Sequence, residues 1–123
     1  MAELKKKTYA ETYKHQRGWG LEVWVENIPE YCGKLLIVEE GKRGSLHFHM
    51  DKLETMYLIE GNVLLKFVDP DTGKDYEIVL EEGDSIMIPR GQAHQIVGLK
   101  KSIIIEFSTV HSESDSLRIK KGD

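Results

Sequence analysis

The sequence predicts an all-β protein, a sandwich or a barrel of short strands, on three observations. Apolar and polar residues alternate in short runs that are rich in branched and aromatic side chains. Glycine, proline, asparagine and aspartate separate these runs at roughly ten-residue intervals, which is typical of sandwiches and barrels. No segment has the longer apolar spacing of an amphipathic helix.

About nine segments have strand character. In the first, 21–26, side chains alternate between two faces, and the turn at 27–30 ends it. The clearest hairpin loop is 69–73, because Pro70 and Gly73 occupy positions that turns favour. In order along the chain, the predicted strands are 21–26, 34–39, 45–49, 54–60, 63–68, 75–80, 85–88, 94–97 and 102–108.

The length of 123 residues suits one domain. We expect residues 1–20 to form an N-terminal segment that packs on the barrel and residues 21–111 to form the barrel itself. Residues 112–123 are predicted to be a polar C-terminal tail, in which Leu117 and Ile119 could dock against the barrel.

Composition excludes several classes of protein. The formal net charge of −4 argues against a general nucleic-acid surface. Cys32 is the only cysteine, so no internal disulfide can form, which fits a reducing compartment. The apolar runs are far too short to span a membrane, and no apolar segment of a signal peptide follows the N-terminal lysines. We therefore expect a cytoplasmic protein.

Four side chains form a candidate metal site. His47 and His49 lie two residues apart in a predicted strand and therefore share one face. Glu54 begins the next strand, and a turn between antiparallel strands would bring its carboxylate beside the imidazoles. With His94 these residues suit one divalent transition metal such as Zn, Mn, Fe or Ni. The alternative is a polar cluster that binds no metal.

The same residues resemble the two motifs of the cupin family. The first motif is matched by Gly41, His47, His49, Glu54 and Gly61, and the second by Gly83, Pro89, Gly91 and His94. Gly98 stands where the second motif usually has asparagine. The resemblance implies a double-stranded β-helix, or jelly-roll barrel, with the metal inside one mouth. It also implies a homodimer, in which pairing would cover exposed strand edges.

Finer features resemble the small mannose-6-phosphate-isomerase-like cupins. They lie at Gly18-Trp19-Gly20, in the segments 45–54 and 104–106, and in Asp115-Ser116-Leu117-Arg118. This resemblance implies a sugar or sugar phosphate as the ligand and isomerisation as the reaction.

An aldose–ketose isomerase needs a metal that polarises the sugar oxygens and a base that moves a proton. Glu106 is the candidate base, because a carboxylate in an apolar strand lines a polar cavity unless it faces solvent. Lys52 is the second candidate catalytic residue. Lys52, Arg90 and Arg118 are candidates to bind a phosphate or carboxylate of the substrate, the alternative being solvated surface charges.

Three functions remain open at this point. The first is a metal-dependent sugar isomerase or epimerase, the second an Fe-dependent dioxygenase, and the third a non-catalytic cupin that binds a small molecule. His15 and His111 lack the spacing of metal ligands, so we expect them at the surface or in loops.

Overall fold

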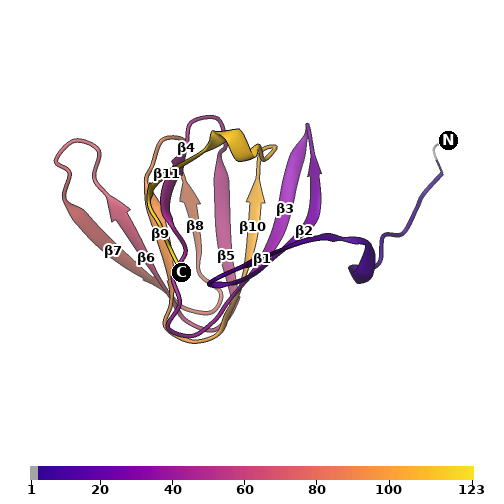
Figure 1. Cartoon of the computed structure of the whole chain (residues 1–123), viewed down its shortest axis with the longest axis horizontal. Coiled ribbons are helices and arrows are strands. Elements are labelled where there is room, and N and C mark those ends of the chain that lie inside the picture. Colours follow the sequence, from indigo (N-terminus) through magenta and orange to yellow (C-terminus); the bar gives the residue numbers. More distant parts are fainter. Residues whose placement is uncertain (1–2) are drawn as a thin grey trace.

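The computed structural model describes residues 3–123, which form two antiparallel β-sheets and two short 3-10 helices (Figure 1). The six-stranded sheet contains, in spatial order, β1 (Tyr13–Arg17), β2 (Gly20–Ile28), β3 (Tyr31–Val38), β10 (Ser102–Ser108), β5 (Glu54–Glu60) and β8 (Ser85–Ile88). The five-stranded sheet contains β11 (Ser116–Lys120), β4 (Leu46–His49), β9 (His94–Gly98), β6 (Val63–Val68) and β7 (Asp75–Leu80). The 3-10 helices are η1 (Tyr9–Glu11) and η2 (Glu113–Asp115).

The all-β fold predicted from the sequence is confirmed, and each predicted strand is present with small shifts of its ends. Two further strands, β1 and β11, were not predicted, because their sequences YKHQR and SLRIK are largely polar. Each lies at the outer edge of its sheet, β1 beside β2 and β11 beside β4. Backbone pairing with a neighbouring strand, rather than apolar burial, therefore defines both elements.

An apolar core fills one end of the space between the sheets. Leu58, Val63, Leu65 and Ile104 are completely buried. Ile104 of β10 lies opposite Leu36 of β3 on one side and opposite Leu58 of β5 on the other. Inward-facing residues of neighbouring strands thus form continuous layers, as side-chain alternation requires.

The other end of the same interior is polar. Lys34 lies two residues before Leu36 in β3, Glu54 four residues before Leu58 in β5, and Glu106 two residues after Ile104 in β10. Because inward-facing positions recur every second residue, these charged groups share the interior face with the core. All three are at most 5% exposed, so the interior changes from apolar to charged along each strand.

The glycines of the two cupin-like motifs have a conformational role. Gly41, Gly61, Gly83 and Gly91 have positive φ angles of 77°, 105°, 90° and 79°. Residues with a Cβ rarely adopt this backbone region, so glycine allows the tight turns between strands.

Gly98 has another role, because a Cβ there would lie 2.6 Å from the carbonyl oxygen of Glu39. That contact accounts for glycine where the family usually has asparagine.

Among residues 3–123, no helix has the length and apolar character needed to cross a membrane.

Candidate metal centre

Three histidines from two adjacent strands gather at the polar end of the barrel. His47 and His49 project from the same face of β4, and His94 of β9 lies directly opposite His47 in the strand register. Each contributes one ring nitrogen, and these nitrogens all lie within 4.8 Å of one another. The group could hold a metal ion, as the alternation of residues 47–49 predicted.

Backbone carbonyls hold the three rings in a common tautomer. The Nδ1 atoms of His47, His49 and His94 lie 3.1, 3.2 and 2.9 Å from carbonyl oxygens of Ser45, Asp115 and Gln92. A carbonyl oxygen can only accept, so in each neutral ring Nδ1 carries the proton and Nε2 keeps its lone pair. The Nε2 lone pairs then remain as the donors that a metal ion needs, and the carbonyl contacts at Nδ1 fix the orientation of the rings.

Burial keeps the two histidines of β4 neutral. Desolvation, with His94 and His49 nearby, lowers the pKa of His47 to about 3. Desolvation and the neighbouring Lys52 also lower the pKa of His49. Both rings are therefore deprotonated at neutral pH, the state in which imidazole binds metal.

Glu54 adds a carboxylate to one side of the group. Its Oε1 lies 2.9 Å from Nε2 of His94, but both Glu54 oxygens and this nitrogen lack a hydrogen bond of acceptable geometry. Glu54 is not within 4.8 Å of all three histidine nitrogens, so its approach is mainly to His94.

A protonated His94 is the alternative to a metal ion. Burial lowers the pKa of this ring, but Glu54 outweighs burial and raises it, which would favour an ion pair. The missing hydrogen bond favours a shared cation instead, because buried polar atoms without partners are costly and a cation would satisfy them. The donor set therefore fits a divalent transition metal held by three histidines, with Glu54 available as a further ligand.

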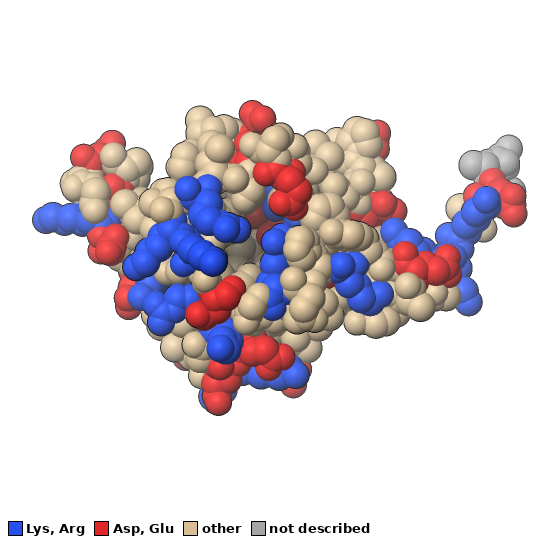
Figure 2. All heavy atoms as spheres, in the orientation of Figure 1, with Lys and Arg blue, Asp and Glu red and all other residues tan. Residues whose placement is uncertain are grey.

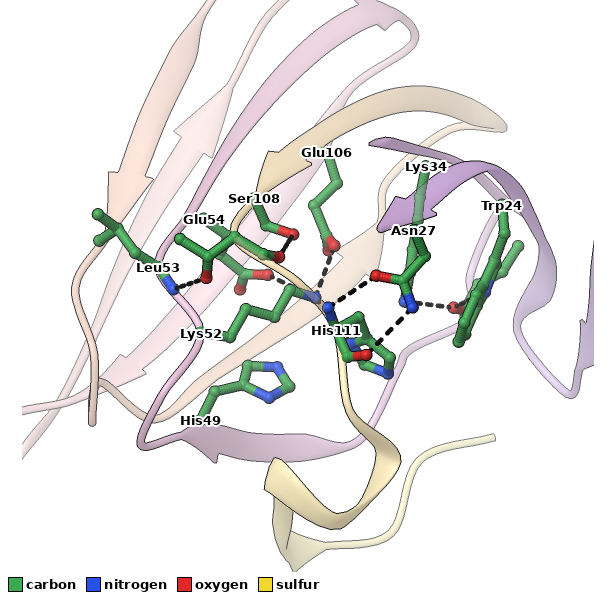
Figure 3. Close-up of polar contacts among 12 residues, drawn as sticks. Trp24, Asn27, Lys34, His49, Lys52, Leu53, Glu54, Glu106, Ser108 and His111 are labelled. Carbon is green, nitrogen blue, oxygen red and sulfur yellow. Dashed lines mark hydrogen bonds and ion pairs between the residues drawn. The ribbon is translucent and has the colours of Figure 1, made fainter. Parts of the chain in front are cut away.

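Lys52 is buried beside this group, and its ammonium lies close to two carboxylates and one imidazole (Figure 3). Nζ lies 2.7 Å from Oε2 of Glu106, 3.3 Å from Oε2 of Glu54 and 3.2 Å from Nδ1 of His111. Burial opposes the charge, but the two carboxylates outweigh it and raise the pKa of Lys52 above its ordinary value. Lys52 thus connects the candidate base Glu106 to the candidate ligand Glu54.

His111 belongs to the site although the sequence placed it at the surface or in a loop. It does lie in a loop, but its side chain is only 7% exposed and its ring packs edge-on against Trp24. Nδ1 accepts from Lys52, so Nε2 carries the proton and donates to Oε1 of Glu113 at 3.0 Å. Burial, with Lys34 and Lys52 nearby, lowers its pKa to about 4. Its sequence neighbourhood is polar and aperiodic, so no local signal marks it.

Asp115 lies in a segment that the sequence analysis singled out, but the sequence assigned it no role of its own. Its carboxylate accepts hydrogen bonds from the backbone N–H groups of Met50, Asp51 and Lys52 at 2.9–3.2 Å. Its carbonyl contacts His49. Asp115 therefore fixes the turn between the paired histidines and Lys52.

A cavity of about 360 Å³ opens above these groups. Figure 2 shows a hollow in this face with Lys and Arg side chains on its borders. Predicted site residues that line the cavity are His47, His49, Lys52, Glu106 and Arg118. Arg90 does not line it and instead donates from Nε to the carbonyl oxygen of Asp51 at 2.8 Å. His94 and Glu54 are buried and do not line this cavity.

The family is defined by a sequence match that covers more than half of the chain. The cupin domain family matches residues 34–107, so this chain belongs to the cupins. The match contains all four predicted metal ligands. No curated protein matches the sequence.

Solved structures share the fold at low sequence identity. A single-residue variant of Bacillus subtilis oxalate decarboxylase has a TM-score of 0.81 and 18% identity, covering 97% of this chain and 34% of the other. A second structure of that enzyme, described for its Mn(II) centres, matches with the same values. The capsular polysaccharide assembling protein CapF of Staphylococcus aureus has a TM-score of 0.78 and 16% identity, covering 89% of this chain and 34% of the other. At these identities the likeness shows the fold alone, and this chain spans about a third of each of these proteins.

Proposed function

We propose that this cupin is a metal-dependent enzyme that acts on a sugar or sugar phosphate, as an aldose–ketose isomerase or an epimerase. One observation carries the proposal: a single cavity is lined both by two histidines of the candidate metal group and by the buried carboxylate of Glu106. A Lewis acid and a base facing the same space are the two groups that proton transfer between adjacent carbons requires.

The environment of Glu106 suits a general base. Burial and the negative charge of Glu54 raise its pKa, although Lys52 and Lys34 act in the opposite direction. A carboxylate with a raised pKa can take a proton from carbon and return it to the neighbouring carbon near neutral pH.

In this mechanism the other residues hold the metal or orient the carboxylate of Glu106. A bound divalent metal would supply polarisation of the sugar oxygens. Lys52 holds Oε2 of Glu106 at 2.7 Å and so fixes the direction in which the carboxylate faces the cavity. His111 restrains Lys52 by accepting a hydrogen bond from its ammonium. Glu106 is the group assigned to proton transfer.

Proton exchange tests the reaction. Metal-loaded protein is incubated in D₂O with aldoses, ketoses and their phosphates, and deuterium at the carbon next to the carbonyl is followed by NMR. We expect exchange with at least one sugar and its loss in Glu106→Gln, which retains the shape of the side chain. Absence of exchange with every sugar in the panel would contradict the proposal.

Metal content tests the ligand assignment separately. His49→Ala and His94→Ala should each lose most of the metal found in the purified wild type while remaining folded, because the apolar core lies at the other end of the barrel. Elemental analysis and circular dichroism measure the two quantities, and His15→Ala is the control, since His15 is outside the histidine group. Full occupancy in either variant would refute the assignment. The same analysis identifies the metal among Zn, Mn, Fe and Ni.

Two alternative functions retain support. Three histidines and a carboxylate also suit Fe(II), so an Fe-dependent dioxygenase is the first, and oxygen uptake by the iron-loaded protein discriminates it. The second is a cupin that binds a small molecule without turnover. It is favoured by the close neighbours of Lys52, since a buried lysine held between two carboxylates and an imidazole can serve structure alone. A ligand bound tightly and recovered unchanged would support that function.

We also propose that the protein forms a homodimer through the outer face of the six-stranded sheet. Phe107 lies opposite Thr55, and Thr55 lies opposite Met87, so these side chains share one face. Phe107 and Met87 are 54% and 57% exposed, and exposed apolar patches commonly mark protein contacts. Sedimentation equilibrium should show a dimer that Phe107→Glu dissociates. A monomeric wild type at micromolar concentration would exclude this.

The proposed location is the cytoplasm. It is supported by Cys32, the single cysteine, which is buried as a free thiol in β3. Cell fractionation with an antibody against the protein would test the location.

A further inference from the structure

The strand register places Arg118 beside the metal group. Arg118 of β11 lies directly opposite His47 of β4, and Ser116 lies opposite His49. Residues paired across antiparallel strands project to the same face, with Cβ atoms about 5 Å apart. Ser116 and Arg118 both line the cavity, and Arg118 has no ion-pair partner among residues 3–123.

A second arginine reaches the cavity from the opposite sheet. Arg17, at the end of β1, donates from Nε to Oε2 of the buried carboxylate of Glu22 at 2.6 Å. The other oxygen of Glu22 accepts from Trp24 Nε1 at 3.1 Å and Lys34 Nζ at 3.3 Å. Glu22 is therefore held firmly and orients Arg17. Within the part of the chain described, the terminal nitrogens of this guanidinium have no ion pair or hydrogen bond.

The segment that follows β11 contacts the end of β1 at the mouth of the cavity. The backbone of Asp123 packs against Gly18, next to Arg17, where a Cβ would find no room. The Asp123 carboxylate accepts from the backbone N–H of Arg43 at 2.7 Å, and Glu113 accepts from His111 at 3.0 Å. The acidic groups at the mouth thus have partners, whereas Arg118 and Lys121 have no ion pair among the described residues.

We propose that Arg118 and Arg17, assisted by Lys121, form an anion subsite at the cavity mouth that binds the phosphate or carboxylate of the substrate. The anion subsite rests on the proposed function in one respect, namely that the rest of the substrate lies at the metal group. The planar guanidinium is suited to both anions because its donors match two oxygens at once. Substrates of this cavity accordingly carry an anionic group, and neutral sugars are poor ligands.

Binding of simple anions tests the subsite without metal or turnover. Inorganic phosphate and glucuronate are titrated by calorimetry into the metal-free full-length protein, and the two arms distinguish phosphate from carboxylate. We expect saturable binding of at least one anion, weakened at least tenfold in Arg118→Gln and in Arg17→Gln. Arg43→Gln is the matched control, because Arg43 does not line the cavity and its backbone contacts with Asp123 remain. Failure of both anions to bind, or equal binding by wild type and both variants, would overturn the proposal.

Matched sugars separate this proposal from the proposed function. Fructose 6-phosphate and fructose are titrated into metal-loaded protein, and the subsite requires the phosphate ester to bind at least tenfold more tightly. Equal affinities would overturn the subsite while leaving the metal-dependent sugar enzyme untouched. Anion binding that depends on the arginines, with no sugar turnover, would instead retain the subsite and contradict the isomerase.

Discussion

The two ends of the barrel interior are built from the same strands but differ in chemistry. At the apolar end, the closed end, Leu58, Leu65 and Ile104 are fully buried and belong to the hydrophobic core. At the polar end, the open end, Glu54 and Glu106 are almost as buried, but their charges depend on ion pairs with Lys52. The closed end gains stability from removing apolar surface from water, whereas the open end must compensate charges that burial disfavours.

This difference separates the sources of stability and chemistry. An apolar layer needs no specific polar partners, so it can hold the strands together while the other end of the interior carries the candidate ligands. A charged layer tolerates burial only when each group has its partner, and the same condition fixes its geometry. Variants at the two ends should therefore fail in different ways.

The largest expected effect is at the open end. Lys52→Met leaves Glu106 and Glu54 buried without their cation and should lower the free energy of unfolding by about 3–5 kcal/mol. Urea unfolding of the metal-free protein measures this. The double variant Lys52→Met/Glu106→Gln should regain a large part of the loss, because it removes one of the unpaired charges. A fully stable single variant would show that the charged layer does not depend on Lys52.

Truncation of the closed end should be nearly as costly but should spare the site. Leu58→Ala leaves a cavity in a layer with no exposed surface and should lower the free energy of unfolding by about 2–5 kcal/mol. Metal content of the folded variant should remain that of the wild type. Loss of metal in a folded Leu58→Ala protein would show that the two ends are coupled rather than separate.

A smaller effect is expected where β4 leads into the open end. Asp115→Ala removes the acceptors for three backbone N–H groups and should cost about 1–2 kcal/mol, a magnitude typical of lost capping side chains. Metal affinity, measured by competition with a chelator, should fall about tenfold because the turn beside His49 loosens. Asp51→Ala, an exposed neighbour, serves as the control and should change neither quantity.

The smallest effect is a pH dependence at Glu22. Burial raises the pKa of this carboxyl, but Lys34 and Arg17 outweigh burial and hold it below its ordinary value of 4.5. A depressed folded pKa means that the stabilisation is present above 4.5 and is lost as the pH falls toward the folded value. Urea unfolding at a series of acidic pH values should therefore show a steeper loss in wild type than in Glu22→Gln. If the free energy of unfolding fell equally with pH in both proteins, the charge of Glu22 would not stabilise the open end.

The sequence was most informative where a side chain's role is local. The alternation His47-x-His49 places both rings on one face of a strand whatever the strand pairs with, and motif glycines mark turns through their own backbone angles. Glu106 was recognisable as a charge among apolar neighbours, although the sequence left open whether it faced solvent or the cavity. Arg90 is near the ligands in sequence, which predicts a contact with the substrate, but the fold turns it toward the carbonyl oxygen of Asp51.

The amino-acid sequence by itself determined the all-β fold, the cupin motifs and the histidines that could hold a metal, because periodicity and turn chemistry act over a few residues. The tertiary structure alone decided that His111 and Asp115 support Lys52 and His49, and that Arg17 and Arg118 lie at one cavity mouth. These residues sit in or beside edge strands and loops whose polar sequences carry no pattern. Their positions come from strand pairing between segments distant along the chain, which local spacing does not specify.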